Sequence, residues 1–186
     1  MAYEAILVGS GEIFVAPVGE TFPAVNAVPA GTWLSLGEID GGVTVNHEQK
    51  LDEHYVDSET APVKVTRSQE GVTLTCNLAD ATLENLARLL NNQTVIPAVG
   101  PPATRKIGMY RGFQVQEFSV LFRANSPYGP YPAQFELPRG YVGGNFGRSF
   151  VKDTKTLTPV EFHVMVDDNA ITDAEKFGRL VAQSSA

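Results

Sequence analysis

The sequence has little cysteine, few cations and no long apolar run, and each shortage excludes a class of protein. Cys76 is the only cysteine among 186 residues, so one chain can form no disulfide framework, which fits folding in a reducing compartment. The formal net charge of −7 argues against a surface that grips nucleic-acid phosphates, because such surfaces are built from Lys and Arg. The apolar runs are far too short to span a bilayer, and residues 1–4 carry no cationic stretch of a secretory signal. We therefore expect no membrane partner.

The remaining composition is that of an ordinary globular protein. Apolar residues make up 43% of the chain and charged residues 19%, which is inconsistent with wholesale disorder. Seventeen glycines and twelve prolines favour many turns and therefore many short strands. A chain of this length can bury one good core, so we expect a single domain over residues 1–186.

Residues 71–92 are the stretch around which the rest is organised. Residues 72–78 alternate apolar and polar side chains without a break, which predicts a strand with one dry and one wet face, and Cys76 lies on the dry face. Asp80 then supplies an N-cap oxygen for a helix predicted over about 80–92, which Asn91 and Asn92 end. Three leucines of this helix form one apolar stripe that we expect to pack on the sheet: Leu83, Leu86 and Leu90.

Similar alternation elsewhere predicts further strands. They fall at residues 13–18, 43–46, 63–67, 117–124 and 160–166. Another strand is expected to end at Pro138, and residues 171–182 are weakly helical, with Thr172 or Asp173 as the cap. The predicted fold is mainly β: an antiparallel β-sandwich or barrel with one flanking α-helix.

Residues 47–62 lack any apolar pattern and are predicted to form a long extended loop. Such loops are uncommon in compact domains unless they are functional, since ordering each residue costs roughly 1–2 kcal/mol of backbone entropy. A neighbouring subunit would offset that cost. We predict that acidic and apolar side chains of the loop make this contact: Leu51, Asp52, Glu53, Tyr55, Val56, Asp57 and Glu59. The alternative is a mobile, solvated loop without a partner.

Catalytic and ligand-binding motifs are scarce. Acidic residues and His54 lie close together within 52–59, but their spacing fits neither an EF-hand nor a zinc motif. The glycines of 140–147 do not precede a helix, so they do not form a phosphate-cradling loop. The histidines have no serine in a nucleophile elbow near them, and Cys76 is predicted to be buried. We therefore expect no catalytic residues, no cofactor, no metal and no enzymatic activity.

The order of elements resembles the major tail tube protein of long-tailed bacteriophages. The resemblance covers roughly residues 30–95 and 155–170, and the glycine-rich 140–147 stretch departs from it. It is carried by the sequences WLSLGEIDGGV (33–43), GVTLT (71–75), TLENL (82–86) and LTPVEFHV (157–164). The resemblance implies a tail-tube-like domain with extended terminal arms, closing into hexameric rings that stack head-to-tail into a hollow tube for DNA.

The resemblance also implies where the protein would act and with what. It implies synthesis in the host cytoplasm and a final place in the virion tail. It further implies tape-measure, terminator and distal tail proteins as partners.

Two features of the residues agree with a tube. Polar strand faces with few cations would suit a lumen through which DNA slides, and the candidates are Thr73, Thr75 and Asn77, or else Glu117 and Ser119. Every charged residue before Lys50 is an acid, whereas most cations lie in the later half. This asymmetry would supply two complementary patches for head-to-tail contact, unless it arises by chance.

Two other readings belong to different functional classes. A carbohydrate- or receptor-binding module would use exposed aromatic side chains as stacking platforms, and the candidates are Trp33, Tyr110, Tyr128, Tyr131 and Tyr141. A capsid decoration protein would share the β-rich fold without forming filaments.

Overall fold

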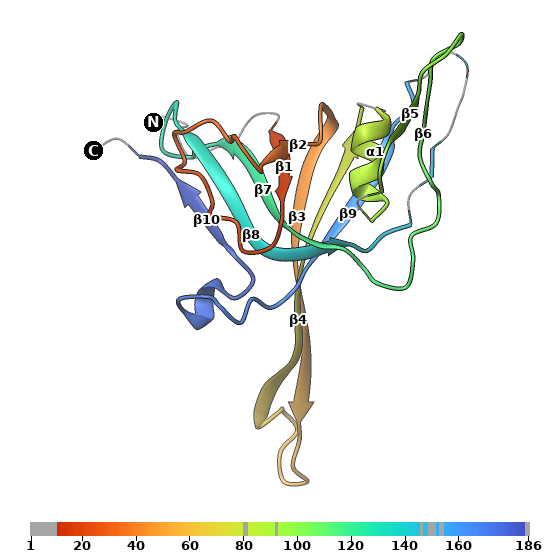
Figure 1. Cartoon of the computed structure of the whole chain (residues 1–186). Coiled ribbons are helices and arrows are strands. Elements are labelled where there is room, and N and C mark those ends of the chain that lie inside the picture. The colour runs from red at the N-terminus through yellow and green to blue at the C-terminus, as the bar shows by residue number, and fades with distance from the viewer. Residues whose placement is uncertain are drawn as a thin grey trace.

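The computed structural model describes residues 11–79, 82–91, 93–145, 147–148, 152 and 155–184. This part of the chain is mainly β, as predicted: an antiparallel eight-stranded sheet, a separate two-stranded pair and one short α-helix (Figure 1). The main sheet has the order β2-β1-β7-β8-β9-β4-β3, with β10 paired to β8, and it does not close into a barrel. The strands are β1 (Glu12–Ala16), β2 (Leu34–Ser35), β3 (Ile39–His54), β4 (Lys64–Leu78), β5 (Ile96–Ala98), β6 (Thr104–Lys106), β7 (Glu117–Asn125), β8 (Pro132–Val142), β9 (Thr158–Val164) and β10 (Arg179–Ala182). The helices are α1 (Leu83–Leu89) and the 3₁₀ turn η1 (Asp173–Glu175).

Strand β4 carries the predicted dry face into the core. Leu74 is fully buried and pairs in register with Val45 of β3 on one side and Phe162 of β9 on the other. Cys76 is buried on the same face, and this burial raises the pKa of its thiol to about 12. Phe162 is itself fully buried and meets the ring of Phe118 edge-to-face, with centroids 5.7 Å apart. The alternating pattern therefore marked the centre of the main core.

Helix α1 is shorter than predicted. It begins at Leu83, and the hydroxyl of Thr82 caps it by accepting a hydrogen bond from the backbone N–H of Asn85 at 3.3 Å. The cap predicted at Asp80 and the stop predicted at Asn92 lie outside the described residues. Two of the three predicted leucines, Leu86 and Leu90, are buried, whereas Leu83 is half-buried. The sequence pattern missed Leu89, the helix residue that joins the main core cluster.

The connection over residues 17–33 covers the second face of β1 and β7. Trp33 is buried there with Phe14 and Leu121, and its ring lies 5.1 Å from that of Phe22. The indole N–H donates to the carbonyl of Thr21 at 3.0 Å, and this hydrogen bond joins the two ends of the connection. This half of the sheet is therefore covered on both faces. The reading of Trp33 as an exposed stacking platform is wrong, because only 6% of the residue is accessible.

Two predicted boundaries in the later half of the chain are also wrong. Strand β8 continues through Pro138 to Val142, because a register shift between Phe118 and Val120 of β7 accommodates the residue that lacks an N–H. The tail predicted as helix forms only η1 and then pairs as β10 with β8. Gly178, at φ +106°, separates the two.

The covered face of β8 buries one carboxylate. Glu136 has a side chain only 5% exposed, and it is bound by Arg179 of β10 at 2.7 Å and by the amide of Gln134. Arg179 is itself 46% exposed, so water screens part of the interaction.

Removing Arg179 is therefore expected to be costly. Arg179→Met would leave the Glu136 carboxylate buried without its cation, and we expect a loss of about 2–3 kcal/mol of unfolding free energy. Urea denaturation at a concentration where the protein is monomeric measures this. The control, Arg179→Met combined with Glu136→Gln, should recover most of the loss. A double variant no more stable than the single one would contradict the assignment.

Candidate assembly surfaces

The region predicted as a loop is the far half of a long β-hairpin. Strand β3 runs to His54 and pairs with β4 from Ile39↔Leu78 to His54↔Lys64. Residues 47–70 of this hairpin, here called the projecting ribbon, extend away from the sheet (Figure 1). Every residue from 47 to 65 is exposed. The apolar pattern vanishes from the sequence because neither face of the ribbon has anything to pack on within the chain.

The ribbon is held by its own hydrogen bonds. Arg67 bonds Gln49 across the two strands and Glu70 along its own strand, each at 3.1 Å. At the far end the N–H of Val63 donates to the carbonyl of His54 at 2.9 Å. A register shift between Lys50 and Leu51 marks a bulge, which bends and twists the strand. The ribbon is thus an ordered arm.

The ribbon tip, residues 51–63, is both acidic and apolar. It contains four carboxylates and no Lys or Arg: Asp52, Glu53, Asp57 and Glu59. Tyr55 donates to the Glu53 carboxylate, which raises the pKa of the tyrosine. Apolar side chains on the ribbon are about half exposed, namely Leu51 49%, Tyr55 58%, Val56 46%, Val63 53% and Val65 50%. The structure therefore places all seven predicted contact residues together at the end of one arm. Their contact with another subunit remains a prediction.

A second projection was missed by the sequence reasoning. Residues 93–116, here called the basic segment, contain Arg105, Lys106 and Arg111 and no acidic residue. They form the β5–β6 pair, which points away from the sheet on the side opposite to the projecting ribbon, and a connection without regular structure that runs back from β6 to β7 (Figure 1). Large apolar side chains are exposed along it: Val99 102%, Met109 75%, Tyr110 73%, Phe113 100% and Val115 62%. The frequency of large apolar residues in this proline-rich connection was the feature of the sequence that could have predicted an exposed contact surface.

The basic segment is bound at both ends of helix α1. Asn91, which follows the helix at φ +63°, donates to the carbonyls of Arg111 at 2.7 Å and Gln114 at 2.6 Å. Arg105 forms an ion pair with Glu84 of α1 at 2.7 Å, with both side chains largely exposed. These bonds fix the direction of the segment relative to the sheet.

The predicted lumen residues divide into two groups. Thr75 and Asn77 are half-buried on the polar face of β4, where they border a hollow that also includes Thr44 of β3 and Glu161 of β9. Thr73 of the same strand is buried, with 9% exposure, so it contributes little to an accessible wall. Beside this face Lys155 forms an ion pair with Asp40, the register partner of Asn77.

The second group lies on β7 and does not form an open face. Ser119 is 1% exposed and donates to the carbonyl of Pro138 at 2.7 Å, so the prediction that it faces an open channel is wrong. Glu117 is partly exposed and accepts two hydrogen bonds from Arg139, at 2.7 and 3.1 Å, which lower the pKa of its carboxyl. Residues 17–33 of the same chain cover this part of the sheet. The alternating pattern of β7 alone could not predict that cover.

The glycine-rich 140–147 stretch has a packing role on the polar face. The ring of His163 stacks on Tyr141 with centroids 5.4 Å apart and bonds Glu161 at 2.8 Å. A Cβ on Gly143 would lie 2.1 Å from the His163 ring, and one on Gly144 would lie 3.0 Å from Glu161. Gly143 and Gly144 have no side chain because the backbone passes directly over this cluster at these two positions.

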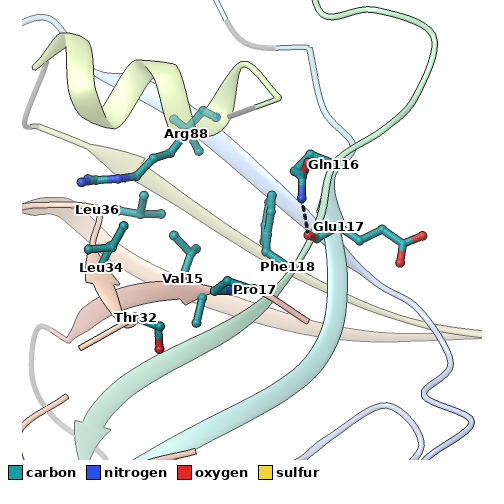
Figure 2. A pocket seen from close by; sticks show the side chains of 11 residues that line it. Val15, Pro17, Thr32, Leu34, Leu36, Arg88, Gln116, Glu117 and Phe118 are labelled. Carbon is teal, nitrogen blue, oxygen red and sulfur yellow. Dashed lines mark hydrogen bonds between the residues drawn. The ribbon is translucent and has the colours of Figure 1, made fainter. Parts of the chain in front are cut away.

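An apolar hollow opens beside α1 (Figure 2). Val15, Leu36 and Phe118 point into it, and Arg88 of α1 lies at its rim, where its guanidinium donates to the carbonyl of Ser35 at 3.2 Å. The side chain of Glu117 points away from the hollow.

The part of the chain that the structure describes lacks two further kinds of binding feature. There, no group of three or more His, Cys, Asp or Glu side chains is arranged to hold a metal ion. The acidic residues considered as ligands lie along the ribbon tip. No α-helix of the described ranges is long and apolar enough to cross a bilayer.

Comparisons with known proteins reveal similarity at the level of fold. No protein-family model matches the sequence, and no curated protein matches it either. Among solved structures, a similar chain occurs in the cryo-EM structure of the anti-feeding prophage (AFP) baseplate, 6-fold symmetrised, with a TM-score of 0.55 and 9% sequence identity over 95% of each chain. The fold is thus one that a prophage baseplate also uses.

Proposed function

We propose that this protein is a structural subunit of a phage-type tail, and specifically that it forms hexameric rings that stack head-to-tail into a tail tube. The observation that carries the proposal is the projecting ribbon, in which residues 47–65 are all exposed although apolar side chains are among them. An isolated two-stranded hairpin is only marginally stable in water. We therefore expect the ribbon to be stabilised by contact with another subunit. A similar fold in a prophage baseplate supports the same class of assembly.

The free sheet edges offer a means of closing a ring. Within the described residues β3 forms one end of the main sheet and β2 the other. Edge strands present unpaired N–H and C=O groups, which pair readily with a strand of another chain. Each subunit would then contribute its polar face, with Thr75, Asn77 and Glu161, to the wall of the channel. A wall with these side chains would let DNA pass without gripping it.

The proposal places the mature protein in the virion after synthesis in the host cytoplasm. Its neighbours there would be further copies of itself, tape-measure, terminator and distal tail proteins, and DNA in transit. The protein would have no enzymatic activity of its own and would need no cofactor.

Electron microscopy of the purified protein tests the proposal. Negative-stain images at increasing protein concentration should show rings and then hollow tubes of uniform diameter. A two-dimensional average of end-on views gives the ring symmetry. Protein that stays monomeric over the whole concentration range, or forms only closed trimers, would contradict the tube and favour a decoration role.

A further inference from the structure

We infer that the ribbon tip of one copy docks on the basic segment of the next copy, so that one chain carries both halves of the stacking contact. The inference rests on the proposed head-to-tail assembly for its setting and names the receiving surface. The occupant is a second copy of this chain, because the two surfaces complement each other in three independent respects.

The first respect is charge. The tip contains four carboxylates without Lys or Arg, and the basic segment contains three cations without Asp or Glu. Each surface therefore repels its own kind and attracts the other, which favours a heterologous contact over a symmetric one. Arg105 is already paired with Glu84 of its own chain at 2.7 Å, so Lys106 beside it is the exposed cation of the β5–β6 pair without an ion-pair partner among the described residues and the main candidate to meet the tip.

The second respect is apolar surface. Tyr55 and Val56 of the tip are about half exposed, and on the β5–β6 pair Ile96 is about half exposed and the adjoining Val99 fully exposed. Contiguous exposed apolar patches on a soluble protein mark interaction sites. Joining the two surfaces would remove both patches from water, and their surrounding charges would form the polar rim that such interfaces have.

The third respect is placement. The ribbon and the β5–β6 pair of the basic segment project in roughly opposite directions from the sheet (Figure 1). Moving one copy along the direction of the ribbon brings its basic segment toward the tip of its neighbour. Repetition of the same step makes a filament rather than a closed pair, which is the geometry of a stacked tube.

Cysteine crosslinking tests the contact directly. Val56→Cys on the tip and Val99→Cys on the segment are mixed as two separate proteins and treated with a short bis-maleimide. The native Cys76 is buried and will not compete. We expect the mixed dimer as the main product, with little of either homodimer. The matched control pairs Val56→Cys with Ile171→Cys, a residue that is 88% exposed but lies outside both surfaces. Equal yields from the two pairings would overturn the inference.

Charge reversal provides a second, independent test. The tip variant Asp52→Lys/Asp57→Lys/Glu59→Lys and the segment variant Lys106→Glu change only exposed side chains, and they leave the Arg105–Glu84 ion pair intact. When only one of these variants is introduced into the two crosslinking proteins, the yield of the tip-to-segment crosslink should fall by about tenfold or more. The reason is that like charges then face each other. Combining both variants in one chain should restore it. Failure of the combination to exceed the single variants would overturn the charge pairing.

Images of the same samples separate this inference from the proposed function. Tubes that form normally without the tip-to-segment crosslink would refute the docking contact and leave the tube proposal standing. A specific crosslink in samples that never form tubes would refute the tube and retain the contact. Absence of both would refute both.

Discussion

Removal of the outer ribbon is expected to yield a folded protein that no longer forms long tubes. Lys50 and Gln69 are register partners, so residues 51–68 can be replaced by Asn-Gly, which favours a two-residue hairpin turn. Buried residues of β4 begin only at Val72, so the core is untouched. We expect the melting temperature to change by only a few degrees. Sedimentation and electron microscopy should show rings or monomers at concentrations where the complete protein forms tubes.

The control for this deletion keeps the ribbon but weakens its tip. Tyr55→Ser/Val56→Ser removes two exposed apolar side chains without shortening the arm. Tube formation should then require a higher protein concentration and should not be abolished. A shortened protein that makes tubes as readily as the complete chain would show that the ribbon does not connect subunits.

Replacing Leu89 by Asp is expected to cause the largest loss of stability among single changes in α1. Leu89 is 4% exposed and is the residue of α1 that joins the main core cluster. The change removes a buried isobutyl group and places a carboxylate against apolar neighbours, which together should cost about 3–5 kcal/mol. Urea denaturation followed by circular dichroism measures the loss.

Leu83→Asp is the matched control within the same helix. Leu83 is half-buried and is the first helical residue, where the helix dipole favours an anion. The same substitution should therefore cost much less there than at Leu89. Equal losses at the two positions would show that α1 does not dock through Leu89.

Local periodicity in the sequence was enough to predict the fold class and the centre of the core. The uninterrupted alternation over 72–78 predicted the buried face of β4, and the leucine spacing predicted a helix beside it. Such patterns are reliable where one face of an element is dry and the other wet, because burial then imposes a period of two or of about 3.6 residues. Composition likewise predicted many strands, and the burial of Cys76 followed from its place in the alternation.

Only the tertiary structure decided the surfaces on which the proposals rest. The projecting ribbon carries no apolar period because both its faces meet solvent, so its strands looked like an irregular loop. Ser119 looked like a wet-face residue, but the connection over 17–33 covers that face from a distance in sequence. The β5–β6 pair of the basic segment points roughly opposite to the ribbon because Asn91 and Glu84 bind the segment to α1 (Figure 1). Contacts between residues far apart in the chain leave no local period, so three-dimensional packing alone determines which faces are covered and which project.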